Sequence, residues 1–173
     1  MFQQKIKIQE DKYYHVFNRG NNRTRIFLEP CNYLYFLKQF EKFVVDFADV
    51  YAYCLMPNHF HLFLRVHDKL LFEKGIKNFF ISYSKSINKR YNRVGSLFQG
   101  RYKAVEVNSE NDYTRIVTYI HQNPLNAGLS VDLEDYQYSS YKEYIDGIPS
   151  FLSKAEVFEW FGNLDNFIYE HQL

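Results

Sequence analysis

The stretch YCLMPNHFHLFLRV, residues 53–66, places a turn signal between two apolar runs. Pro57 and Asn58 are residue types that favour turns, and the runs on both sides have the composition of strands. We therefore expect a β-hairpin with strands at 50–56 and 59–66. The other strands and helices can be assigned relative to this hairpin.

The second strand of the hairpin has two different faces, because side chains alternate along a strand. One face carries His59, His61, Phe63 and Arg65. The other face carries Phe60, Leu62, Leu64 and Val66. We expect the apolar set to meet helices, while the two histidines project from the opposite face, where both can reach one metal ion. The alternatives are a pair of surface histidines, or core histidines with hydrogen-bond partners.

The rest of the chain alternates between strand-like and helix-like patterns of apolar residues. In chain order we expect a strand at 13–20, a loop at 21–30, a helix at 31–47, the hairpin, a basic amphipathic helix at 70–93, a strand at 96–107 with a bulge or bend at Gly100, and helices at 108–123 and 153–161. The order β-α-β-β-α-β predicts an α+β protein. Its ferredoxin-like antiparallel sheet has two helices on one face and additional C-terminal helices.

The helix that begins near Ser109 carries two polar side chains on one face. Asp112 follows Ser109 at capping-box spacing, and Pro124 predicts that the helix ends near Asn123. Tyr119 and Asn123 are four residues apart, so a phenol and an amide oxygen lie side by side and can approach the histidines together. An apolar stripe that would hold this helix down consists of Tyr113, Ile116, Val117 and Ile120.

Composition indicates a folded protein of one compact domain. The 173 residues are 46% hydrophobic and 24% charged, unlike a disordered chain. The two cysteines, Cys31 and Cys54, lack metal-site spacing and favour a reducing, cytoplasmic location. No apolar run approaches the ~20 residues of a membrane span.

Charge is unevenly distributed although the formal net charge is only +1. Residues 69–103 contain nine basic residues and one acid, whereas residues 130–173 contain nine acids and two lysines. This asymmetry favours a basic surface with a polyanionic partner. The alternative is a solvated helix face. Aromatic residues make up 20% of the chain and can fill a core or stack on unpaired bases.

Five blocks of sequence in collinear order resemble the REP-associated tyrosine transposases, which belong to the single-tyrosine branch of the HUH endonucleases. The blocks are FNRGNNRTRIF (17–27), MPNHFHLFL (56–64), LFQGRYKA (97–104), YIHQNPLNAGL (119–129) and YSSY (138–141). The similarity extends from about residue 13 to residue 141. It implies a catalytic domain at 1–128 and a C-terminal extension at 129–173 that packs on the same domain.

The resemblance also implies an activity and a site. Members of this group cleave and rejoin single-stranded DNA, including hairpin substrates, through a 5′-phosphotyrosine. Carried over, Tyr119 is the nucleophile, and His59, His61 and Asn123 hold Mg²⁺ or Mn²⁺. Gln122 is a reserve ligand beside Asn123.

Basic and amide-rich segments are the expected DNA contacts. Phosphates would be bound by cations of the helix at 70–93, by the segment GRYKA and by the loop NRGNNR. The residues are Arg19, Asn21, Arg23, Lys85, Lys89, Arg90, Arg101 and Lys103. For the loop residues the alternative is an ordinary polar loop.

Two other functions compete with a tyrosine transposase. One is a non-catalytic nucleic-acid-binding module on the same fold, and the other is a metal-dependent nuclease in which water attacks. The sequence is compatible with a monomer or a homodimer.

Overall fold

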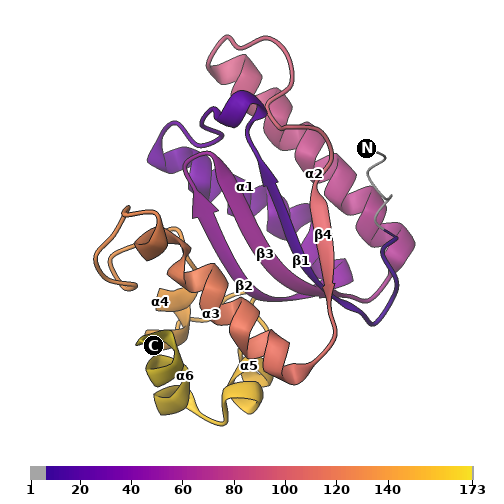
Figure 1. Cartoon of the computed structure of the whole chain (residues 1–173). Coiled ribbons are helices and arrows are strands. Elements are labelled where there is room, and N and C mark those ends of the chain that lie inside the picture. The colour runs from indigo at the N-terminus through magenta and orange to yellow at the C-terminus, as the bar shows by residue number, and fades with distance from the viewer. Residues whose placement is uncertain (1–6, 173) are drawn as a thin grey trace.

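The computed structural model describes residues 7–172 (Figure 1). In chain order its main elements are β1 (Tyr13–Arg19), α1 (Pro30–Val44), β2 (Ala48–Met56), β3 (His59–Val66), α2 (Lys69–Arg90), β4 (Lys103–Val107), α3 (Glu110–Asn126), α4 (Tyr141–Ile145), α5 (Lys154–Phe161) and α6 (Leu164–Gln172). Short 3₁₀ turns occupy Asn21–Arg23 and Val45–Phe47. No helix within residues 7–172 combines the length and apolar character that crossing a membrane requires.

The four strands form one antiparallel sheet in the order β2-β3-β1-β4. This order and the helical connections confirm the ferredoxin-like α+β fold predicted from the sequence. β1 lies at the centre, and its register places Phe17 opposite His61 and His15 opposite Phe63.

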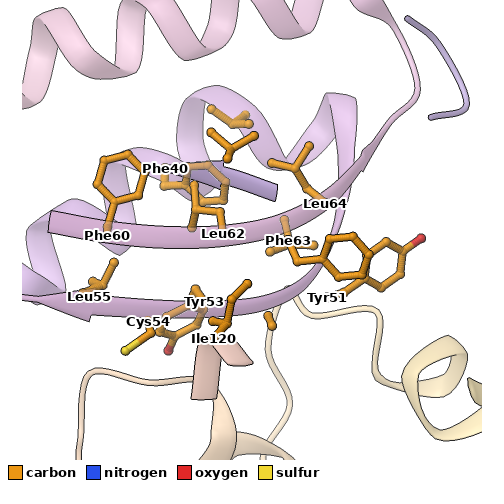
Figure 2. Packing of buried hydrophobic residues seen from close by; sticks show 14 of the residues in the cluster. Phe40, Tyr51, Tyr53, Cys54, Leu55, Phe60, Leu62, Phe63, Leu64 and Ile120 are labelled. Atoms are coloured by element: carbon orange, nitrogen blue, oxygen red, sulfur yellow. The ribbon is translucent and has the colours of Figure 1, made fainter. Parts of the chain in front are cut away.

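The two faces of the sheet are covered by different helices. Figure 2 shows Phe60, Leu62 and Leu64 projecting from β3 toward Phe40 of α1, with Ile120 of α3 on the other side. Phe60 also lies within 6 Å of Phe36 of α1 and Phe80 of α2, at centroid separations of 5.2 and 5.8 Å. The expected placement of the apolar face of β3 against two helices is therefore confirmed. The histidine face looks toward α3.

The expected strand at 96–107 is wrong in its first half. Only Lys103–Val107 pairs with β1, whereas residues 96–102 form an irregular segment with one isolated bridge between Gly20 and Phe98. Leu97 and Phe98 are both buried, so this part lacks the alternation of a half-exposed strand. The bend expected at Gly100 is present, with φ of 75°.

Helix ends also differ from expectation. α3 continues through Pro124 to Asn126, one turn beyond the predicted end, and closes when Ala127 N–H donates to the Asn123 carbonyl at 3.0 Å. A proline removes one hydrogen bond from a helix, yet α3 continues past Pro124, whose side chain is buried. At the other end, Ser109 caps the helix as predicted, because its hydroxyl accepts from Asp112 N–H.

The acidic C-terminal segment packs along β2 and α3. The amide of Leu55 donates to the Tyr138 carbonyl, and the amide of Ser140 donates to the Tyr53 carbonyl, each at 2.9 Å. Ser153 N–H donates to the Val50 carbonyl, also at 2.9 Å. These bonds satisfy part of the outer edge of β2, and in Figure 1 α4 and α6 lie beside α3. The division at residue 128 stays a prediction.

Gly75 marks the close contact between α1 and α2. A Cβ added there would lie 2.1 Å from the carbonyl oxygen of Phe43, so the helices would have to move apart. Alanine in place of glycine raises helix propensity by about 1 kcal/mol, but overpacking costs about 1–3 kcal/mol. We expect Gly75→Ala to lower the free energy of unfolding in urea. Asn78→Ala, at an exposed position of the same helix, is the control and should not be destabilising.

Candidate functional site

A cleft of about 550 Å³ opens between the histidine face of the sheet and α3. Its lining includes all four residues that the sequence analysis selected as nucleophile and metal ligands. They are His59, His61, Tyr119 and Asn123. The two histidines come from β3 and the other two residues from α3, so the cleft joins segments about 60 residues apart in the sequence.

In both histidines a hydrogen bond at Nδ1 orients the imidazole ring. Nδ1 of His59 lies 2.6 Å from Oδ1 of Asn58, and Nδ1 of His61 lies 2.8 Å from Nε2 of His15. An amide oxygen only accepts, so Nδ1–H of His59 is the donor and its Nε2 carries the lone pair. Within residues 7–172, neither Nε2 atom of the pair has a hydrogen-bond partner. Both rings therefore have Nε2 available for a metal or a ligand.

Burial keeps these imidazoles neutral. It lowers the pKa of His61 to about 3, and the neighbouring His15 and His59 add to the shift. Burial also lowers the pKa of His59, and the charge of Arg19 acts in the same direction. A neutral imidazole is the form that coordinates a metal ion.

His15 of β1 is a site residue that the sequence analysis missed. Its ring stacks on His61 at a centroid distance of 5.1 Å and meets the ring of Tyr119 edge-on at 6.0 Å. When His61 presents Nε2 as a ligand, its Nδ1–H donates to Nε2 of His15, which fixes the tautomer and tilt of the His61 ring. The signal was the alternation of YYHVF in β1, but only the strand register shows that His15 reaches His61.

Tyr119 and Asn123 occupy one face of α3, as their spacing predicted. The Tyr119 ring is 46% exposed, lies 5.7 Å from the His61 ring, and its hydroxyl has no hydrogen-bond partner in the described part of the chain. Asn123 donates from Nδ2 to the Tyr119 carbonyl at 2.8 Å, which leaves its Oδ1 available. Buried Val117 and Ile120 hold the opposite face of the helix down.

The donor set suits a divalent cation that is completed by non-protein ligands. Two imidazole nitrogens and one amide oxygen line the same cleft. Among residues 7–172, no group of three His, Cys, Asp or Glu side chains is arranged to hold a metal. Besides the two histidines, the cleft offers Oδ1 of Asn123 as a neutral oxygen that could act as a third protein ligand. Such a shell leaves positions for water and for a phosphate oxygen.

The neighbouring residues of α3 face away from the cleft. Gln122 donates from Nε2 to the His171 carbonyl at 3.0 Å, so the reserve ligand is directed toward α6. His121 is buried, and its two ring nitrogens contact His171 at 2.8 Å and Ser140 at 2.7 Å. His121 thus joins α3 to the C-terminal segment.

The predicted DNA contacts fall into three groups and one separate residue, Asn21. Arg19, Arg23 and Lys103 line the cleft itself. Lys85 and Arg101 line a second hollow beside α2. Asn21 is exposed outside both, with its amide donating to the Leu97 carbonyl at 2.9 Å.

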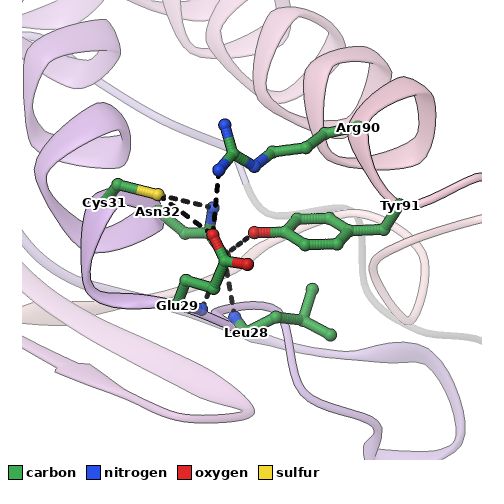
Figure 3. A network of polar contacts seen from close by, with 6 residues as sticks. All are labelled: Leu28, Glu29, Cys31, Asn32, Arg90 and Tyr91. Atoms are coloured by element: carbon green, nitrogen blue, oxygen red, sulfur yellow. Dashed lines mark hydrogen bonds and ion pairs between the residues drawn. The ribbon is translucent and has the colours of Figure 1, made fainter.

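Lys89 and Arg90 form the third group and line a hollow together with Cys31 and Asn32 of α1. Figure 3 shows Arg90 directed toward Glu29 at the start of α1. Arg90 donates to Glu29 at 2.9 Å, and Tyr91 donates to Asn32 at 3.1 Å. The ion pair lowers the pKa of Glu29. Arg90 thus contributes to a network that ties the end of α2 to α1.

Comparisons with known proteins show the family and the fold of this chain. The family model described as "Transposase IS200 like" matches residues 8–123. A solved structure of a REP-associated tyrosine transposase bound to a REP hairpin has 15% sequence identity and a TM-score of 0.66, with 87% of this chain and 90% of the other covered. A crystal structure from Deinococcus radiodurans R1, described only as that of a candidate transposase, has 15% identity and a TM-score of 0.45, with 70% and 97% covered. No curated protein sequence matches.

The family match covers more than half of the chain and includes every element that builds the cleft. It extends from the segment before β1 through Asn123 of α3. The structural similarity supports the same fold. The protein is thus a member of the IS200-like transposase family.

Proposed function

We propose that this transposase cleaves and rejoins single-stranded DNA through a covalent 5′-phosphotyrosine on Tyr119. The proposal rests on the set of side chains that line one cleft. Two imidazoles with free Nε2 atoms, an available amide oxygen and an unpartnered phenol line it together. A nucleic-acid-binding module would not require that combination.

In the proposed chemistry, Tyr119 is the nucleophile. Oη of Tyr119 attacks the scissile phosphorus, the bond from phosphorus to O3′ breaks, and the phenol proton passes to solvent. The departing oxygen takes up a proton and becomes a free 3′-OH. The phosphodiester energy is kept in the bond to Tyr119, so attack by another 3′-OH rejoins the strand without a nucleotide cofactor.

We propose that His59, His61 and Asn123 hold Mg²⁺ or Mn²⁺. When bound, such a cation would supply positive charge beside the scissile phosphate and would stabilise charge on the departing oxygen. Imidazole suits Mn²⁺ better than Mg²⁺, whose preference is for oxygen. Arg19, Arg23 and Lys103 add fixed charges that orient the phosphate in the cleft.

We propose a DNA hairpin with a short single-stranded foot as substrate. A structural relative is bound to a REP hairpin, and the present cleft is open and edged by cations, as an unpaired strand requires. The foot would enter the cleft, because a flexible single strand can bend its backbone toward Tyr119 more readily than a stiff duplex can.

End-labelled hairpin oligonucleotides test this proposal. After incubation with Mn²⁺ and denaturing electrophoresis, label on the 3′ side of the cleavage point should migrate with the protein. Label on the 5′ side should appear as a free fragment ending in 3′-OH. Release of both fragments without any protein-bound label would show that water, not tyrosine, attacks.

His15 provides a further prediction about the metal site. Loss of a partner that orients a metal-bound histidine typically weakens metal affinity about 10–100-fold. His15→Leu should therefore raise the Kd for Mn²⁺, measured by electron paramagnetic resonance without DNA. His15→Gln keeps an acceptor and should recover part of the affinity.

His67→Leu is the matched control for His15, because this exposed histidine pairs with Asp49 at the far end of β3. An unchanged Mn²⁺ affinity in His15→Leu would show that His15 does not position His61 for metal binding.

A further inference from the structure

A second hollow of about 1080 Å³ runs between α2 and the irregular segment at 96–102. We call it the α2 groove. Its basic side chains are Lys74, Lys77, Lys85 and Arg101. Among residues 7–172, Glu73 is the only acid in its lining. The groove therefore has a net positive charge and favours a polyanionic occupant.

The cations of the α2 groove are free to act on a ligand. In the described part of the chain, none of these four makes an ion pair with a carboxylate. Arg90, on the same helix but outside the groove, is instead engaged by Glu29.

Aromatic rings form the floor of the α2 groove. Phe80 and Tyr102 are half-buried and nearly parallel, with centroids 5.9 Å apart and an interplanar angle of 17°. Phe98 meets Phe80 edge-on at 5.0 Å. Exposed Leu70 and Ile81 extend the apolar surface. Cations beside aromatic rings are the combination that binds single-stranded nucleic acid.

The α2 groove and the cleft are separated by one short stretch of chain. Gln99 and Lys103 line the cleft, whereas Arg101 and Tyr102 line the groove. Between them, the Gly100 carbonyl accepts a hydrogen bond from Asn18 at 3.2 Å. A Cβ placed on Gly100 would meet no atom within 4 Å, so the space over this crossing is open.

We propose that the α2 groove binds the unpaired DNA flanking the nucleotides held in the cleft, with phosphates on its lysines and bases against Phe80 and Tyr102. This inference rests on the proposed function for the identity of the nucleic acid. The strand crosses from one hollow to the other over Gly100. Unpaired bases are required along the groove, because neighbouring pairs cover the faces of bases inside a duplex. A symmetric dimer in which two α2 grooves face each other is disfavoured, because it would oppose like charges.

Fluorescence anisotropy without divalent metal tests the α2 groove, because binding is then measured without cleavage. Two hairpins are compared: one with a foot that fills only the cleft, and one with about eight additional unpaired nucleotides, within the range of single-strand sites. Both the 5′ and the 3′ extension are tried. We expect one extension to tighten binding at least about tenfold, a gain of the size that stacking gives.

Two variants of the α2 groove should lose the increase in affinity that the extension gives. Lys85→Glu replaces a phosphate-binding cation with an anion, and it should lower the salt slope by about 0.7 for each phosphate that the protein no longer neutralises. Tyr102→Leu keeps an apolar side chain but removes a stacking surface. Lys38→Glu, an exposed lysine of α1 outside both hollows, makes the same charge change as Lys85→Glu and should keep the gain.

The proposal is overturned if neither extension tightens wild-type binding, or if Lys38→Glu removes the gain as fully as Lys85→Glu. It is also overturned if Lys85→Glu changes the mass measured by light scattering and leaves the gain intact, because the groove would then be a dimer interface. Failure of the proposed chemistry gives a different result. The extended hairpin would still bind more tightly than the short one, but no covalent adduct would form with Mn²⁺.

Discussion

Replacing His59 or His61 with alanine is expected to reduce DNA cleavage about 10³-fold or more. Metal stabilisation of a departing oxygen contributes several kcal/mol, and each 1.4 kcal/mol corresponds to about a factor of ten. In both histidines Nδ1 makes the hydrogen bond and Nε2 stays available, so either substitution removes one of the three proposed protein ligands. Binding of uncleaved hairpin DNA should change little, since the cations of the cleft remain.

Two measurements separate loss of metal from loss of fold or of DNA binding. The Kd for Mn²⁺ is obtained from electron paramagnetic resonance, and the Kd for a hairpin is obtained by anisotropy in the absence of metal. His67→Ala replaces an exposed histidine beyond the far end of β3, outside the cleft, and is the control. A His61→Ala protein that binds Mn²⁺ as tightly as wild type would refute the ligand assignment.

Tyr119→Phe is expected to eliminate cleavage and the covalent adduct together. The substitution removes only the nucleophilic oxygen, because the Tyr119 hydroxyl makes no hydrogen bond within residues 7–172 and the ring is 46% exposed. Stability and hairpin affinity should therefore be unchanged. Cleavage by this variant would favour a nuclease in which water attacks, and binding without cleavage in the wild type would favour a non-catalytic module.

Tyr113→Phe is the matched control for Tyr119→Phe. Tyr113 lies on the same helix, but its ring stacks on Tyr13 at 4.3 Å, outside the cleft. It should cleave like the wild type. Equal loss of cleavage in both variants would indicate that α3 is sensitive to any change, and would remove the support for Tyr119 as nucleophile.

Local periodicity was sufficient to predict the faces of the main elements. Alternation in β3 separated Phe60 and Leu62 from the two histidines, and i to i+4 spacing placed Tyr119 beside Asn123. These patterns depend only on the geometry of one strand or one helix. For that reason they can be predicted without knowing which other elements the strand or helix packs against.

Features that depend on register or tertiary packing were missed or wrong. His15 reaches His61 because β1 and β3 pair in one register, which no pattern in β1 alone specifies. Residues 96–102 have strand-like composition, yet Leu97 and Phe98 are both buried and pair with the segment that follows β1. Packing also kept α3 helical through Pro124, against the local preference.

Mass spectrometry of the covalent adduct tests the central claim most directly. Wild-type protein is incubated with a hairpin oligonucleotide and Mn²⁺, the DNA is trimmed by nuclease, and trypsin releases the peptide spanning residues 116–142, which has no internal lysine or arginine. The account predicts a nucleotide phosphate linked to Tyr119 on that peptide. A modification at another residue, or strand cleavage without any modified peptide, would contradict it.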